Sequence, residues 1–111
     1  MSSQDGDPRN LRVIPVRAVI LPMRPRADLA AIVRRFNRLD PMQVRHSRTI
    51  VVGPGDRPML LSVTQSAVML ELIVADDDEL ARVAAELDQE LSGFELTVNW
   101  EDLPEVPAPF R

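Results

Sequence analysis

The sequence predicts an α+β domain of the ferredoxin-like (split βαβ) type, a two-layer sandwich with the element order β-α-β-β-(β)-α-β. Three observations predict this fold. A run rich in β-branched residues precedes an amphipathic helix, a turn-rich hexapeptide separates two apolar runs, and a helix with clear end signals leads into an alternating strand. We expect two helices on one face of a mainly antiparallel sheet.

The first strand and the first helix lie in the arginine-rich part of the chain. Residues 11–21 are rich in Val and Ile, which predicts a strand, and Pro15 suits an early or edge position because it lacks an amide donor. Apolar spacing predicts a helix over residues 26–39, which ends before the proline at position 41. The apolar face of this helix comprises Leu29, Ile32, Phe36 and Leu39.

Residues 48–74 predict a hairpin and a further strand. The hexapeptide 53–58 has two glycines and two prolines, which predicts a turn between strands at 48–52 and 59–64. Alternating apolar residues predict a strand over 67–74. Gln65 and Ser66 mark either a second tight turn or a bulge in one bent strand, and the sequence leaves both open.

The second helix has the clearest end signals. Asp76 is a good N-cap, and Glu79 completes a pair of the capping-box type. Gly93 stands where a left-handed C-terminal cap is expected. Alternation over residues 94–101 then predicts a strand with one buried and one polar face.

The composition predicts one small domain with two tails. The chain has 111 residues, of which 45% are hydrophobic and 27% charged, which is typical of globular domains. We expect a disordered N-terminal tail at 1–10, a single α+β domain at 11–101 and a Pro-rich C-terminal tail at 102–111. Because there is no cysteine, thiol catalysis, disulfides and cysteine-ligated metals are excluded.

The same composition bears on where the protein works. No run of residues is apolar and long enough for a signal peptide or a membrane span, so we expect no membrane partner and a cytoplasmic location. All thirteen basic side chains are arginine, which indicates the genome of a GC-rich bacterium or its phage.

The charges are divided between the two halves of the chain. Residues 1–57 hold eleven arginines and five acidic residues, a net +6, whereas residues 58–111 hold two arginines and twelve acidic residues, a net −10. Such asymmetry is found in surfaces for acidic partners. The alternative, which we favour, is that the halves neutralise each other within one fold.

Three candidate chemical sites each have a structural interpretation. His46 is adjacent to Ser47, but neighbouring side chains on an extended segment point to opposite faces and do not form a catalytic pair. The acidic residues 76–79 fit a helix cap better than a cation site, and residues 53–58 fit a hairpin better than an anion loop. The sequence therefore predicts no catalytic residue, no cofactor and no metal.

The candidate contact residues for a protein partner or a small anionic ligand are arginines and a few apolar side chains. Nucleic-acid binding is not expected, because the isoelectric point is about 4.9 and aromatic residues are only 4% of the chain. Met69 and Ile73 are expected on the sheet face away from the helices, where they favour self-association. The full set is Arg24, Arg26, Arg34, Arg35, Arg38, Arg45, Arg48, Met69, Ile73 and Phe110.

We therefore expect a non-catalytic protein-interaction or assembly module, either a homo-oligomer or an accessory subunit of a larger complex. The alternative is a small-molecule or anion-sensing regulatory domain that uses the arginine-rich first half. The sequence does not identify the partner or the ligand.

Overall fold

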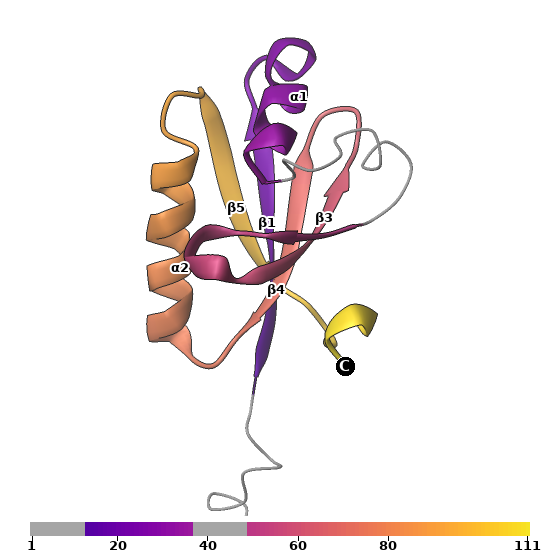
Figure 1. The fold of residues 1–111 in the computed structure, drawn as a ribbon, viewed down its shortest axis with the longest axis vertical. Helices are drawn as coiled ribbons and strands as arrows, with labels where there is room; N and C mark the ends of the chain where they lie inside the picture. Colours follow the sequence, from indigo (N-terminus) through magenta and orange to yellow (C-terminus); the bar gives the residue numbers. More distant parts are fainter. Residues whose placement is uncertain (1–12, 37–48) are drawn as a thin grey trace, which may run out of the picture.

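The protein folds into a five-stranded sheet with two helices (Figure 1). The computed structural model describes residues 13–36 and 49–111. The α+β class predicted from the sequence is confirmed. The elements are β1 (Ile14–Pro22), α1 (Pro25–Phe36), β2 (Thr49–Val52), the 3-10 turn η4 (Pro54–Asp56), β3 (Pro58–Val63), β4 (Val68–Val74), α2 (Asp77–Glu90), β5 (Leu96–Asp102) and the 3-10 turn η5 (Ala108–Phe110).

The strands are ordered β2-β3-β4-β1-β5, and each strand is antiparallel to its neighbours. The strand β1 has a neighbour on each side, so Arg17 lies opposite both Glu71 of β4 and Glu101 of β5. The outermost strands among the described residues are β2 and β5. The antiparallel order also means that β4 and β5 run in the same direction on either side of β1.

Both helices contribute to one hydrophobic core on one face of the sheet. Alternate residues of β1 and β4 point into it, as the period of two requires. The predicted apolar face of the first helix is confirmed for Ile32 and Phe36, which are buried, while Leu39 lies outside the described residues. The other core members include Val16, Ala18, Ile20, Val68, Leu70, Leu72, Val74, Val83, Leu87 and Leu91.

The end signals of α2 act as the sequence predicts. The Asp76 carboxylate accepts a hydrogen bond of 2.8 Å from the Glu79 amide, and the Glu79 carboxylate accepts one of 2.6 Å from the Ala75 amide. The Ala75 hydrogen bond, and then the Arg57 guanidinium, hold the pKa of Glu79 below its usual range. Gly93 has φ +112°, the left-handed region that favours glycine at a helix end.

Residues 59–74 form two strands joined by a tight turn. The Thr64 amide donates to the Ala67 carbonyl at 2.9 Å, and the Ala67 amide donates to the Thr64 hydroxyl at 3.0 Å. Of the two arrangements that the sequence allows, the structure therefore has the turn. The turn places Val68 opposite Val63, which sets the register of β3 against β4.

The hairpin of β2 and β3 is anchored to α2 at its tip. Arg57 donates to the Glu79 carboxylate at 3.2 Å, and η4 lies against α2 (Figure 1). Met59 is fully buried beneath Gly53, whose missing side chain leaves room for the methionine sulfur. Within residues 13–36 and 49–111, neither helix has the length and apolar content needed to cross a bilayer.

Candidate interaction site

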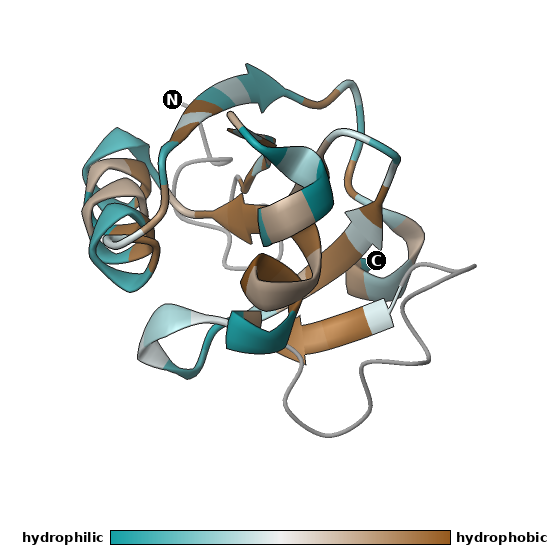
Figure 2. Ribbon diagram, turned by 90° about the horizontal axis from the view of Figure 1, so that it is seen from above, coloured by the Kyte–Doolittle hydropathy of each residue, from teal (hydrophilic) through white to brown (hydrophobic). Residues whose placement is uncertain are grey.

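A candidate interaction surface in the described part of the chain is the edge strand β2. Its sequence, Thr-Ile-Val-Val, has no charge and no proline. Ile50 is 53% exposed and Val52 is 63% exposed, while Val51 between them is buried in the core. In Figure 2, β2 is the strand that follows the grey trace of residues 37–48, and most of its length is hydrophobic. Large exposed apolar side chains on a sheet edge favour association with another strand.

The backbone of β2 also has hydrogen-bonding groups that are not used in its pairing with β3. The Gly53 amide donates to the Arg57 carbonyl at 2.7 Å, and this pair closes the hairpin. Hydrogen-bonded pairs alternate along an antiparallel ladder, so Val51 and Thr49 are the next residues bonded to β3. The N–H and C=O groups of Ile50 and Val52 therefore point away from β3, on the same residues that expose apolar side chains.

The opposite edge of the sheet is different in character. The exposed residues of β5 are polar or acidic, and they include Glu101 and Asp102. Charged side chains on an edge strand disfavour pairing with a further strand. Of the two outermost strands in the described residues, β5 carries charged side chains and β2 carries none.

The sheet face away from the helices, which we name the open face, carries a row of three charged residues. The Arg17 guanidinium donates to the Glu71 carboxylate at 2.9 and 2.6 Å and to the Glu101 carboxylate at 3.1 Å. The Glu71 side chain is only 4% exposed, Arg17 is 32% exposed and Glu101 is 50% exposed. Because the three residues are directly opposite one another on adjacent strands, the row links β4, β1 and β5.

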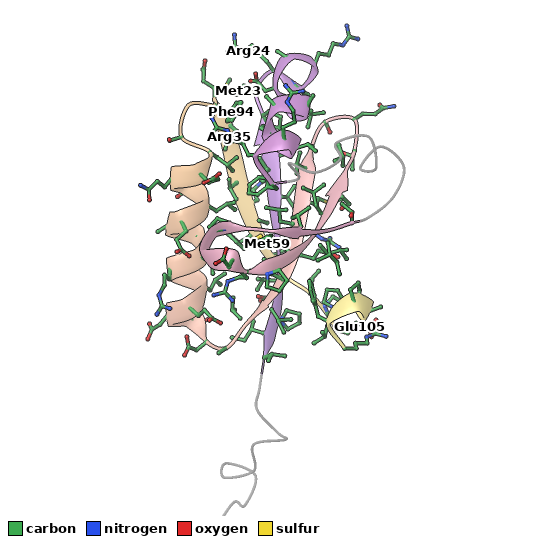
Figure 3. The ribbon with its side chains drawn as sticks, viewed as in Figure 1. Met23, Arg24, Arg35, Met59, Phe94 and Glu105 are labelled. Carbon is green, nitrogen blue, oxygen red and sulfur yellow. The ribbon has the colours of Figure 1, made fainter. Side chains whose placement is uncertain are left out.

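The C-terminal segment lies beside this row. The Leu103 amide donates to the Pro15 carbonyl at 3.0 Å, which continues the pairing of β5 with β1. Residues 103–108 and 111, together with Arg17 and Glu71, line an open hollow of about 280 Å³. In Figure 3, Glu105 marks this segment on the side of the molecule away from α2. The segment thus borders part of the open face.

The predicted apolar contacts lie on or near this face. Met69 and Ile73 alternate with Glu71 on β4 and are half-buried. Phe110 is half-buried in η5, where its amide donates to the Pro107 carbonyl at 2.9 Å. Since Pro107 is buried, part of the proline-rich segment is already in contact with its own chain.

The predicted arginine contacts separate into two groups. Arg24, Arg26, Arg34 and Arg35 are all exposed, in or next to α1. Arg24 lies 3.7 Å from Glu95, and the Arg35 guanidinium lies 5.6 Å from the centre of the Phe94 ring (Figure 3). The remaining predicted residues, Arg38, Arg45, Arg48 and also His46, lie outside the described residues.

The ion pairs connect the basic half of the chain with the acidic half. Among the described residues, four pairs cross the division at residue 57: Arg17–Glu71, Arg17–Glu101, Arg24–Glu95 and Arg57–Glu79. Three of the eleven arginines of the first half, Arg17, Arg24 and Arg57, are thus paired with acidic residues of the second half. The neutralisation of the two halves favoured from the sequence stays a prediction. The arginine-rich half therefore gives weaker support to a polyanion site than its composition alone indicates.

The other candidate sites serve local structure. Asp76 and Glu79 are used in the helix cap, and residues 13–36 and 49–111 contain no group of acidic or histidine side chains placed to hold a metal ion. Residues 53–58 form the hairpin connection, with Gly55 and Asp56 at positive φ of 69° and 58°.

No protein-family model, no curated protein and no solved structure matches this chain.

The sequence interpretation did not single out Ile50 and Val52. Their strand has apolar residues at three successive positions, so it shows no polar face. Its position at the edge depends on strand order, which pairs residues far apart in the chain. The absence of charge across Thr49–Val52 was the one local signal available.

Proposed function

We propose that the protein is a non-catalytic interaction or assembly module that associates with another protein strand through β2. The observation that carries this proposal is the exposure of Ile50 and Val52 on an uncharged sheet edge. Added strands gain backbone hydrogen bonds, and side chains on alternate positions give specificity. A bacterial, cytoplasmic homo-oligomer or accessory subunit would use the surface in this way.

We also propose that the fold is ferredoxin-like, with β2 as an additional edge strand. The order supports this assignment because β4 and β5 run in the same direction around β1 and are connected through α2. Likewise, β1 and β3 run in the same direction around β4. Two such split βαβ units interleave in a ferredoxin-like sheet. In this description, β2 extends the sheet beyond its four common strands.

The alternative function is a sensor for small anions, based on the exposed arginines of α1. Arg26 and Arg34 support this alternative function, because both side chains are exposed on α1. However, their backbone positions are about 12 Å apart along the helix axis, so both side chains would have to lean toward each other to contact one small anion. A rise in melting temperature with inorganic pyrophosphate, lost in Arg34→Gln, would support the sensor.

The interaction proposal is tested with Val52→Lys and a matched control, Thr97→Lys. Both positions are exposed on outermost strands of the described sheet, so each variant adds the same charge to an edge. The wild-type protein, isolated gently from its own cell, should have a native mass above the 12.4 kDa of one chain. Val52→Lys should lose the additional mass, and Thr97→Lys should keep it. A single-chain mass for the wild type, or equal effects of both variants, would refute the proposal.

A further inference from the structure

We propose that β2 pairs with β2 of a second copy, antiparallel and about a twofold axis, with Ile50 of each copy opposite Val52 of the other. This inference rests on the proposed function, and it specifies the occupant and the register. Three properties of β2 carry it: its free backbone groups, the alternation of its side chains and its lack of charge.

The free backbone groups determine which residues can bond. Only Ile50 and Val52 direct their N–H and C=O groups away from β3, as the alternation from the Gly53–Arg57 hydrogen bond requires. In an antiparallel pair, two opposite residues exchange both N–H···O bonds when their groups face each other. The outward-facing backbone groups of Ile50 in one copy and Val52 in the other can form such a pair. The twofold axis produces a second, identical pair.

Side-chain alternation then restricts the register. With the axis perpendicular to the sheet, the open face of one copy continues as the open face of the other, so opposite residues must lie on the same face. Ile50 can therefore stand opposite Ile50, Val52 or Pro54 of the second copy. Pro54 has no N–H group to donate, and Ile50–Ile50 pairing leaves Val52 without an opposite residue inside β2. Only the Ile50–Val52 register keeps both pairs within Thr49–Val52.

The charge distribution favours a second copy at this edge. The chain has a net charge of −4, so copies repel one another in general. Strand β2 contains no charged residue, whereas pairing through β5 would place the charged residues Glu101 and Asp102 in the paired strands. The pairing also covers the exposed parts of Ile50 and Val52 with each other, in cross-strand pairs of β-branched side chains.

The register can be tested by cross-linking because the chain contains no cysteine. Val51 lies on the proposed axis and faces Val51 of the second copy in a non-hydrogen-bonded pair, where Cα atoms are about 4.5 Å apart. That distance suits a disulfide. Under mild oxidation, Val51→Cys should form a covalent dimer of twice 12.4 kDa, while Thr97→Cys, at the β5 edge, should form it at least tenfold more slowly.

Sedimentation equilibrium of the purified protein provides the second measurement. The wild type should dimerise, and Val52→Lys should weaken the dimer at least tenfold, since symmetry places each substitution in the interface twice. A wild-type monomer at all concentrations, a dimer unaffected by Val52→Lys, or equal cross-linking rates for the two cysteine variants would overturn self-pairing. If the purified protein is monomeric but Val52→Lys releases a different chain from the native complex, the proposed function stands and only the second-copy inference fails.

Discussion

Replacement of Arg17 by methionine tests whether the charged row on the open face contributes to stability. The substitution keeps an unbranched apolar stem but removes three hydrogen bonds to carboxylates. One of these carboxylates, on Glu71, is only 4% exposed, so the substitution removes the Arg17 charge from beside a buried carboxylate. Breaking a buried ion pair from one side costs about 3–5 kcal/mol. Because Arg17 itself is 32% exposed, we expect a cost below this range, about 2–3 kcal/mol.

Two further variants separate the contribution of the Arg17–Glu101 ion pair to stability from that of the buried Arg17–Glu71 ion pair. Glu101→Gln removes a carboxylate that is half exposed, so it should cost less than about 1 kcal/mol. The double variant Arg17→Met/Glu71→Leu removes the buried charge together with its ion-pair partner, so it should be more stable than Arg17→Met alone. This ordering identifies the loss of the Arg17 charge beside the buried Glu71 carboxylate, and not lost packing, as the main cause of the effect.

Urea unfolding monitored by fluorescence provides the assay, since Trp100 is the only tryptophan and is packed against the core from β5. The free energy of unfolding should fall in the order wild type, Glu101→Gln, double variant, Arg17→Met. The reasoning is wrong if Arg17→Met costs no more than Glu101→Gln. It is also wrong if the double variant is less stable than Arg17→Met.

Three other predictions concern the hairpin and the cap of α2. Gly53→Ala would place a methyl group 2.6 Å from the sulfur of buried Met59, so it should cost about 1–3 kcal/mol, and much less in a Met59→Val background. Asp76→Ala should cost about 0.5–2 kcal/mol in urea unfolding, because the cap hydrogen bond is lost. The Ala75 hydrogen bond lowers the pKa of Glu79 in the folded protein. The ionised Glu79 side chain therefore stabilises the fold at pH values above its ordinary pKa, and this stabilisation is lost as the pH falls through the lowered pKa. The stability difference between wild type and Glu79→Gln should therefore be constant near neutral pH and shrink below about pH 4.5.

Local signals in the sequence were sufficient for the elements of the fold. The cap residues Asp76 and Glu79 and the glycine at position 93 mark the ends of α2 because capping depends on neighbours within a few residues. The turn residues at 53–58 likewise specify the hairpin. Periodicity also placed Glu71 on the face away from the helices, since side chains alternate along a strand.

The strand order and the pairing across it could not be predicted in this way. Glu71 and Glu101 are separated from Arg17 by 54 and 84 residues, and nothing near any of them specifies the register that brings them together. The sequence does not determine which face of the sheet Leu60 occupies, for the same reason. In the structure it lies opposite Glu71 and is 4% exposed, while Met59 and Leu61 enter the main core.

The open face and the β2 edge offer two different routes to self-association, and their energetics differ. Stacking of two open faces would remove solvent from Arg17, Glu101, Glu105 and Arg111, which are all at least partly exposed. Desolvation of such charges costs free energy that new contacts must recover. The C-terminal segment also borders this face and would have to fit between the copies. Pairing at β2 removes no charge from water and satisfies backbone groups that β3 leaves free. We therefore propose sideways extension of the sheet, and not stacking, as the mode of self-association.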